Sequence, residues 1–454
     1  MIHQLKTDLF SGKTTSVDLV KAAIALNQKY LDKRALALIS PNALALAATR
    51  DEERKQGKIK GPLHGIPVVI KDNICYADGT PTTANSFALA NFFPKTNAPL
   101  VDALINAGAI ILGKANLSEF AYFMGDEKMP SGYGSMYGQV KHPVDESIDP
   151  YGSSTGSAVA VALGIVPIAI GTETNGSLMA PAYQTQIVSF KPTVGMISRR
   201  GIIPISPTQD TAGPMTTSVE DCAILMDVIS DIDPQDALTQ SVVRPSSFTE
   251  KIYPLLKPQR IGIVYFDNQP YDAIDQSILD ANKAELLSQG HDVKVFHMNH
   301  PALDNYPTLL REFKVSLNTF LASHQQEGCP ASLAEIIAFN EKHADRCLKY
   351  GQATLIASQA TPDAYNQDFH QMRQQLLEEA KMMQTLLVEE NLDVIMTPTW
   401  TGFAPIYGNP CLCLPKGYVE GKPKGLVLVG KKGHDAELLQ FGYHFYDKKI
   451  KDSK

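Results

Sequence analysis

The sequence has few cysteines, no long apolar run and no excess of basic residues. Six cysteines occur in 454 residues, and none has the C-x-x-C spacing. Neither a disulfide framework nor a thiolate zinc site is therefore predicted. The longest apolar run, 158–170, contains Gly164 and Pro167 and is shorter than the roughly 20 residues that span a bilayer. We expect a buried helix that turns into a strand there, and no membrane segment.

The charge balance is mildly acidic. Lys and Arg number 41 against 48 Asp and Glu, which gives a formal charge of -7. Because the basic residues are scattered along the chain, nothing resembles the electrostatic footprint of a nucleic-acid-binding protein. Residues 1–13 lack the apolar core of a secretory signal. These features favour a cytoplasmic protein in a reducing compartment, although removal of a leader would leave the same sequence.

The composition predicts a large buried core. Hydrophobic residues make up 44% of the chain and charged residues 20%, which excludes a disordered chain, a collagen and a coiled coil. A prior of roughly 150 residues per domain suggests about three domains, but α/β enzymes often run longer as one unit. We therefore expect a single domain over 1–454, with a helical insertion or lid at about 301–390, where Glu, Gln, Lys, Leu and Ala dominate.

Helical and strand patterns alternate along the chain, which is typical of an α/β fold. The pattern 260–296 reads as a β-α-β unit with a stop at Gly290. The other predicted elements are helices at 16–30 and 100–107 and strands at 68–70, 109–112, 393–396, 411–414 and 425–429.

Three polar clusters are candidates for chemistry. Residues 152–157 (GSSTGS) precede a helical pattern, and a Gly/Ser loop there suits an oxyanion or a proton relay, or is simply a capped turn. Residues 171–177 (GTETNGS) follow an apolar strand and hold a serine after an Asn-Gly turn, although a hairpin turn has the same composition. Lys71 ends an apolar strand, where burial lowers the pKa of a lysine, unless its side chain is solvated. Neither a P-loop nor a G-x-S-x-G elbow is present.

In this order, the three clusters resemble the amidase signature family. GIPVVIKDNI at 65–74 resembles the strand that carries the family's catalytic lysine, GSSTGSAVAVA at 152–162 its Gly/Ser loop, and GTETNGSLMAPA at 171–182 its nucleophile segment. The resemblance continues through 190–215 and covers about 14–230 and 390–445. It implies a large mixed β-sheet with helices on both sides.

The resemblance also implies roles for single residues. Ser177 matches the nucleophile, Ser153 the bridging serine and Lys71 the base, in a Ser-Ser-Lys triad. The Gly152-Ser153 peptide bond is expected to be cis. Backbone N–H groups around the nucleophile form the family's oxyanion hole, which here means Thr174, Asn175, Gly176 and Ser177. No metal and no organic cofactor is implied.

The expected function is hydrolysis of a neutral carboxamide, possibly a peptide C-terminal amide, to a carboxylate and ammonia through an acyl-serine. The sequence is most similar to the branch with peptide amidases and broad amidases, on GTETNGS and the stretch 332–345. One alternative is the glutaminase-type amidase subunit of a tRNA-dependent amidotransferase. It is disfavoured because relatives that bind a carboxylate often carry Arg where this chain has Met179 and Ala180. The other is an inactive binding protein with the same fold.

Several further residues lie near these motifs. Asp210 falls on a family motif position, and we assign it a structural role beside the site. Tyr151 and 184–186 are expected to narrow or reshape the pocket. Trp400, Phe120, Tyr122 and Phe123 either line it or pack in the core. His291, His297 and His300 bracket a predicted strand, but their spacing fits no metal motif, and we expect surface histidines.

Overall fold

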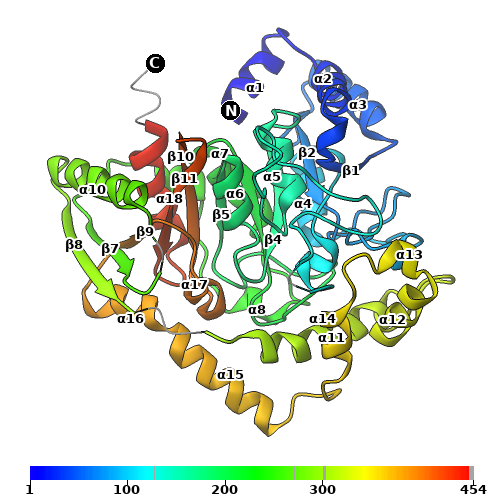
Figure 1. The fold of residues 1–454 in the computed structure, drawn as a ribbon. Coiled ribbons are helices and arrows are strands. Elements are labelled where there is room, and N and C mark those ends of the chain that lie inside the picture. The colour runs from blue at the N-terminus through cyan, green and yellow to red at the C-terminus, as the bar shows by residue number, and fades with distance from the viewer. Residues whose placement is uncertain (127, 270, 300–302, 449–454) are drawn as a thin grey trace.

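The computed structural model describes residues 1–126, 128–269, 271–299 and 303–448. Its centre is an 11-stranded sheet with the order β1-β3-β2-β4-β6-β5-β10-β11-β9-β7-β8 (Figure 1). The pairings of β2 with β3 and β4, and of β7 with β8 and β9, are parallel, and the other pairings are antiparallel. The strands are β1 (Leu36–Ile39), β2 (Pro67–Lys71), β3 (Ile110–Ala115), β4 (Ile168–Glu173), β5 (Val188–Lys191), β6 (Thr211–Thr216), β7 (Arg260–Phe266), β8 (Asp292–Met298), β9 (Val394–Thr397), β10 (Cys411–Val419) and β11 (Lys422–Gly430).

Helices cover both faces of the sheet, because its central strands are apolar on both sides. In β2, Val68 and Ile70 join one hydrophobic cluster and Val69 joins the other, as the alternation of side chains along a strand requires. The first cluster packs under α1 (Ile2–Phe10), α4 (Pro99–Asn106), α7 (Val219–Ile229), α9 (Phe248–Ile252), α10 (Ala273–Ser288) and α18 (Asp435–Gly442). The second packs under α2 (Ser16–Lys29), α3 (Ala43–Lys55), α5 (Thr155–Ala162), α6 (Met179–Thr185), α16 (Met382–Glu389) and α17 (Phe403–Tyr407). The expected mixed sheet with helices on both sides is confirmed.

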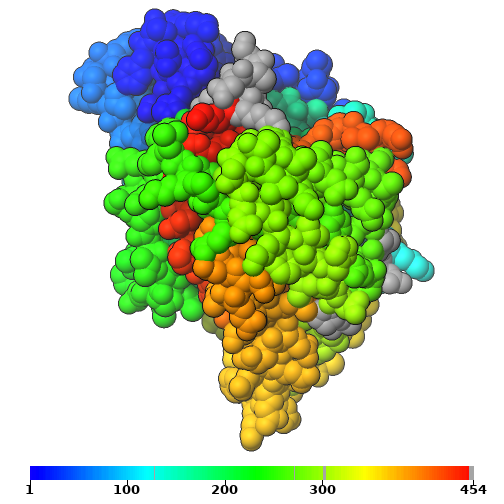
Figure 2. Space-filling model, turned by 90° about the vertical axis from the view of Figure 1, so that its left-hand side faces the viewer, coloured from blue at the N-terminus to red at the C-terminus, as the bar shows by residue number. Residues whose placement is uncertain are grey.

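The segment from 303 to 390 is mostly helical, as expected; residues 301 and 302 lie outside the described part of the chain. Its helices gather along the lower side of the sheet in Figure 1, and α15 projects from the body in the side view of Figure 2. α11 packs its apolar face on the loops around Phe120 and Ile205 in a cluster of its own. The helices that precede α16 are α11 (Tyr306–Ser323), α12 (Leu333–Lys342), α13 (Ala344–Cys347), α14 (Ala353–Gln359) and α15 (Gln367–Ala380).

Most of the predicted elements are present. The helix expected at 16–30 is α2, and the β-α-β unit is β7, α10 and β8. The apolar run 158–170 is the expected helix turning into a strand. Within the described residues, no helix combines the length and the apolar character that crossing a membrane requires.

Several strands differ from expectation. β1 and β5 were not predicted, and β10 and β11 are longer than the predicted strands. β3 continues beyond residue 112 to Ala115, because it pairs with both β1 and β2. Gly113 permits this close pairing, since a Cβ at residue 113 would lie 2.2 Å from the Leu38 carbonyl oxygen. β6 was not predicted, since Gly213 and Pro214 indicate a turn. Nevertheless β6 pairs with β4 and β5, and Gly213 lets the Phe190 carbonyl approach to 2.3 Å of the position a Cβ would take.

Candidate active site

Lys71 is the last residue of β2, a strand that lies between β3 and β4, and its side chain is completely buried. Its Nζ lies 2.7 Å from Ser153 Oγ and 3.0 Å from Ser154 Oγ. It also lies 3.2 Å from the Thr172 carbonyl oxygen and 2.9 Å from Thr172 Oγ1. The strand end thus delivers an amine into a cage of hydroxyl and carbonyl oxygens.

Among the described residues, no carboxylate is in direct contact with the amine of Lys71. Burial is the main cause that lowers the pKa of Lys71, to about 7, because it removes water from the ammonium form. The carboxylates of Asp210 and Glu173 oppose this by their charge and raise the pKa. A substantial fraction of Lys71 is therefore neutral near pH 7.

The cage also directs the lone pair of the neutral amine. Ser154 Oγ donates to the Thr172 carbonyl at 2.8 Å, so it can only accept from Lys71. The Thr172 carbonyl likewise only accepts. A neutral amine has two N–H donors and one lone pair. When Ser154 Oγ and the Thr172 carbonyl accept both N–H groups of the neutral Lys71 amine, its lone pair faces the hydroxyls of Ser153 and Thr172. Thr172 Oγ1 already accepts a hydrogen bond from Asn73 Nδ2 at 3.0 Å.

Ser153 belongs to the Gly/Ser loop before α5. The Gly152-Ser153 peptide bond is cis, as the resemblance implied. Ser118 N donates to the Ser153 carbonyl at 3.2 Å and fixes the loop from the side. Glycine at residue 152 leaves room for the Ser118 side chain, because a Cβ there would lie 2.5 Å from Ser118 Oγ. The side chain of Ser153 is fully buried beside Lys71.

Ser177 lies in the turn from β4 to α6, so the cluster is not a hairpin. Gly176 has φ of 81°, which favours glycine, and a Cβ there would lie 3.1 Å from Trp400. Ser177 is 9% exposed, and its carbonyl accepts from Ser154 N at 3.3 Å. The structure describes both serine side chains and places no hydrogen bond between the hydroxyls of Ser153 and Ser177.

Two carboxylates hold the turn 174–177 at its ends. Thr174 Oγ1 donates to Asp210 Oδ1 at 2.5 Å, and Gln209 Nε2 donates to the Thr174 carbonyl at 3.1 Å. At the other end, Glu173 Oε2 accepts from the backbone N–H groups of residues 178 and 179 at 2.7 and 3.1 Å. The N–H groups of Asn175, Gly176 and Ser177 have no acceptor among the described residues. They are free to bind an oxyanion.

Asp210 does more than cap a turn. Its Oδ2 accepts from the backbone N–H groups of Ile205 and Ser206 at 2.8 and 2.9 Å. Burial raises the pKa of this carboxyl, while the hydrogen bond from Thr174 and those from the two N–H groups oppose the rise. Its expected position beside the site is confirmed.

A front pocket of about 390 Å³ opens onto Ser177. Five of the described residues that line it are aromatic and none is charged. Tyr151 and Tyr183 lie edge-on to Trp400, with ring centroids 5.3 and 5.8 Å apart. The lining residues are Ala121, Tyr122, Phe123, Ser131, Tyr151, Gly152, Thr174, Asn175, Gly176, Ser177, Ala180, Ile205, Tyr306, Leu309, Thr354 and Trp400.

The expectations for the pocket hold in part. Trp400, Tyr122, Phe123 and Tyr151 do line it. Phe120 does not; it packs in the core, 6.2 Å from the ring of Phe313. Residues 184–186 are not in the lining either. Gln186 Nε2 instead donates to the carbonyls of Tyr183 and Lys424, because its backbone ends α6 next to β11.

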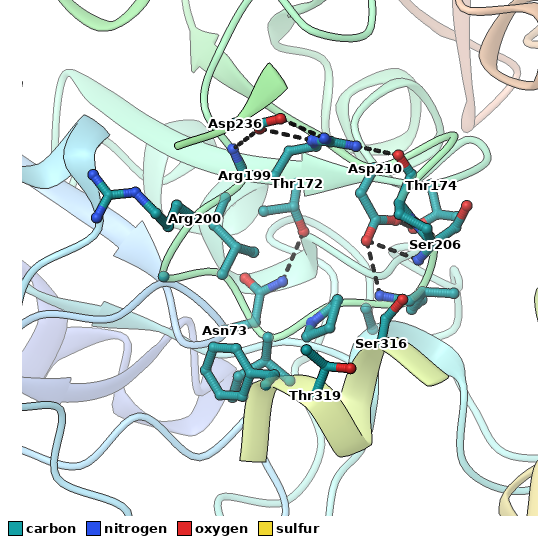
Figure 3. Close-up of a pocket in the computed structure, with 18 of the residues that line it drawn as sticks. Asn73, Thr172, Thr174, Arg199, Arg200, Ser206, Asp210, Asp236, Ser316 and Thr319 are labelled. Carbon is teal, nitrogen blue, oxygen red and sulfur yellow. Dashed lines mark hydrogen bonds and ion pairs between the residues drawn. The ribbon is translucent and has the colours of Figure 1, made fainter. Parts of the chain in front are cut away.

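A second, rear pocket of about 430 Å³ lies between α11 and the loop 199–207. Thr172 and Asn73 line this rear pocket, and Thr174, Ile205 and Ala121 line both pockets. Figure 3 shows Arg199 paired with Asp236 at its edge and Ser316 and Thr319 of α11 on the opposite side.

The two described histidines near β8 make separate contacts; His297 is exposed and His291 is half-buried. His297 Nδ1 lies 2.8 Å from Asp267 Oδ1, and His291 Nδ1 accepts from Gln259 N at 3.0 Å; His300 lies outside the described residues. In the described ranges, no group of three or more His, Cys, Asp and Glu side chains is placed to hold a metal ion.

The sequence reasoning named Lys71, Ser153 and Ser177 but missed their supports. Ser154 and Thr172 complete the cage around Lys71, and Glu173 fixes the start of α6. All three are polar residues within the predicted clusters 152–157 and 171–177, and their position at strand or helix ends was the available signal. Tyr306 reaches the front pocket from α11, and no local pattern in the sequence marks it.

Most of the chain is similar to known amidases and to related proteins. A model of the Amidase family matches residues 18–410. A probable amidase from Arabidopsis thaliana is 33% identical over 429 residues, which are 89% of this chain and 81% of that protein. One of the subunits of a glutamyl-tRNA(Gln) amidotransferase from Chloroflexus aurantiacus is 32% identical, over 96% of this chain and 93% of that protein. The crystal structure of a peptide amidase from Stenotrophomonas maltophilia is similar with a TM-score of 0.92 and 34% identity, over 99% of this chain and 96% of that one.

Proposed function

The chain belongs to the amidase family, and on this basis we propose that it hydrolyses uncharged carboxamides to a carboxylate and ammonia through an acyl-Ser177 intermediate. The observation that carries the proposal is the buried amine of Lys71, with a pKa near 7, 2.7 Å from the hydroxyl of Ser153. Such an amine is a base at neutral pH, and no histidine is needed.

In the acylation step, Ser177 Oγ attacks the amide carbon. Its proton passes to Ser153 Oγ as Ser153 gives its own proton to the lone pair of Lys71. We expect a rotation of the Ser177 side chain to bring its hydroxyl to Ser153 when substrate binds. The negative charge moves to the carbonyl oxygen, where the N–H groups of 174–177 stabilise it by about 3–4 kcal/mol per donor.

The same residues then act in reverse. The Lys71 ammonium returns the proton through Ser153 to the leaving nitrogen, the C–N bond breaks, and ammonia departs. Water next attacks the acyl-Ser177 ester and gives a proton along the same chain. Collapse of this second tetrahedral intermediate breaks the C–O bond, restores the Ser177 hydroxyl and releases the carboxylate.

The front pocket supports the finer proposal that the substrates are peptide C-terminal amides or similar amides with an apolar acyl group. None of its described lining residues is charged and five are aromatic, so the pocket suits neutral groups. The similar structure of a peptide amidase supports the same class. The relatives that belong to amidotransferases raise the alternative of a glutaminase role in such a complex. However, none of the described lining residues carries a charge that could bind a substrate carboxylate. In addition, Met179 and Ala180 occupy the positions where relatives that bind a carboxylate often carry Arg.

The test is the intact mass of the protein after treatment with a serine-directed fluorophosphonate, together with ammonia release from peptide amides, simple carboxamides and glutamine. We expect one adduct on the wild type and on Ser157→Ala, a matched buried serine of α5, and none on Ser177→Ala. Ammonia should come from neutral amides. Folded wild-type protein that forms no adduct and releases no ammonia would instead indicate an inactive binding protein, and preference for glutamine would indicate the amidotransferase role.

A further inference from the structure

The front pocket and the rear pocket share part of their walls. Ala121, Thr174 and Ile205 line both pockets, so one residue separates the two spaces at each of these positions. We call these three residues the shared wall. Ala121 contributes only a Cβ to it, and Thr174 belongs to the turn 174–177, which carries the free N–H groups. The two pockets therefore meet next to the place where the carbonyl oxygen of a substrate is held in the proposed mechanism.

The rear pocket has room and apolar surface for a substituent of a substrate. Its volume of about 430 Å³ lies within the usual range for small-molecule sites. Ile202, Ile203, Val315 and Phe320 give it apolar surface.

The charged side chains in the lining of the rear pocket have partners within the protein. Arg199 Nη2 lies 2.5 Å from Asp236 Oδ1, and Arg200 Nε lies 2.8 Å from Asp233 Oδ2. Asp210 accepts one hydrogen bond from a threonine hydroxyl and two from backbone N–H groups. A charged ligand would compete with these contacts, so the pocket favours an uncharged group.

The rear pocket reaches the molecular surface at α11. Thr319 and Ser323 line it and are exposed, and Figure 3 shows Thr319 near Ser316 on the side of α11 that faces the pocket. This opening matters after acylation, because the acyl group still occupies the front pocket while the amine leaves. A bulky amine then has an exit that does not pass the acyl group.

A secondary amide has the geometry to use both pockets. In its trans form, the substituent on nitrogen points away from the acyl group and lies on the same side of the C–N bond as the carbonyl oxygen. With the acyl group in the front pocket and the oxygen at the turn 174–177, this substituent is directed toward Thr174 and hence toward the shared wall.

We infer that the rear pocket binds the amine part of secondary amides with an apolar substituent on nitrogen, and that the protein hydrolyses anilides and similar amides as well as primary amides. The inference rests on the proposed function. The substituent passes the shared wall over Ala121. Ser177 Oγ forms the new C–O bond, the C–N bond breaks, and the proton held by Lys71 returns through Ser153 to the nitrogen. A neutral amine leaves through the rear pocket, and water then cleaves the acyl-Ser177 ester as for a primary amide.

The experiment compares three amides of one acid, N-acetylphenylalanine: the primary amide, the N-methylamide and the anilide. All three give the same acid, so chromatography of this product measures kcat/KM for each. For every variant, the ratio of anilide to primary amide is compared with the wild-type ratio, which cancels effects on the acyl group and on the chemical steps that the substrates share. In the wild type we expect all three amides to be hydrolysed.

Thr319→Trp fills the rear pocket from α11 and should lower the ratio of anilide to primary amide about tenfold, the size of effect that overpacking commonly has. Ser316→Trp is a second variant of the same kind, and Ala121→Leu, which narrows the passage, should lower the same ratio. The N-methylamide, whose methyl group is too short to reach α11, should keep its wild-type ratio to the primary amide in the two Trp variants. Ala322→Trp, at an exposed position of α11 outside the lining, is the matched control and should leave every ratio unchanged.

A folded wild type that hydrolyses the primary amide but not the anilide would overturn the inference and leave the proposed function in place. Wild-type ratios in both Thr319→Trp and Ser316→Trp, or an equal fall of the ratio in Ala322→Trp, would do the same. A wild type that hydrolyses none of the three amides would overturn both.

Discussion

Lys71 Nζ lies 2.7 Å from Ser153 Oγ, and both side chains are fully buried. The amine is therefore placed to exchange protons with a hydroxyl instead of with water. Since burial lowers its pKa to about 7, the proposed mechanism depends on the protonation state of Lys71 at neutral pH. This relationship leads to the first two predictions.

We expect kcat/KM to rise with pH through a limb near pH 7. Lys71 is a base only when neutral, and below its pKa it carries a proton and cannot accept another. Ammonia release from a neutral amide, measured between pH 5.5 and 9, gives the limb. Lys71→Met should lose about 10²–10⁴-fold in kcat/KM, the usual contribution of a general base.

The neutral amide substrate does not titrate in this range, so the limb belongs to the enzyme. A flat profile from pH 5.5 to 9 with full activity would show that Lys71 does not act as the base.

Ser154→Ala should move this limb to lower pH and lower kcat. Ser154 Oγ accepts from Lys71 at 3.0 Å and so stabilises the ammonium form. Its loss lowers the pKa of Lys71 further, and it also frees one N–H group to disturb the direction of the lone pair. The pH profile of kcat/KM measures the shift.

Ser157→Ala is the matched control for this variant. Ser157 lies in the same helix and donates to the Ile170 carbonyl at 3.2 Å, away from Lys71. An equal shift of the limb in both variants would mean that general loosening of α5, and not the contact with Lys71, causes it.

Asp210→Asn should combine two effects. The charge of Asp210 raises the pKa of Lys71, so its removal should also move the acidic limb to lower pH. In addition, the hydrogen bond from Thr174 fixes one end of the turn that carries the oxyanion donors. We expect kcat to fall about tenfold or more with little change in KM, because these donors act mainly on the transition state.

Thr174→Val separates the two effects, since it removes the hydrogen bond but leaves the charge of Asp210. It should lower kcat without moving the limb. A limb that moves equally in both variants would contradict the assignment of the shift to charge.

Much of the fold was predictable because its strands and helices carry local signals. The strand that ends in Lys71 and the unit β7-α10-β8 follow from apolar runs and helical periodicity. β6 was not predicted, because Gly213 and Pro214 indicate a turn. Its strand conformation depends on pairing with its neighbours β4 and β5. Whether 301–390 is an insertion in a single domain stays a prediction.

The site was predictable where motif and resemblance coincide, and not where distant segments meet. Lys71, Ser153 and Ser177 stand in recognisable motifs. The contact of Lys71 with Thr172 depends on the parallel pairing of β2 with β4, which no short stretch of sequence specifies. Likewise Tyr306 reaches the front pocket only because α11 packs beside the loop at Ile205.

The last prediction concerns the ion pair that supports the end of β2. Lys114 Nζ lies 2.9 Å from Asp72 Oδ1, and both side chains are fully buried. Lys114→Met leaves the Asp72 carboxylate buried without its partner and should lower the free energy of unfolding by about 3–5 kcal/mol. Lys114→Met combined with Asp72→Asn removes both charges and should restore part of that loss.

Lys141→Met, at the more exposed ion pair with Glu146, is the control and should lower the free energy of unfolding by less than about 1 kcal/mol. Urea unfolding of the four proteins measures these differences, and equal losses at Lys114 and Lys141 would show that the buried pair does not stabilise the strand that carries Lys71.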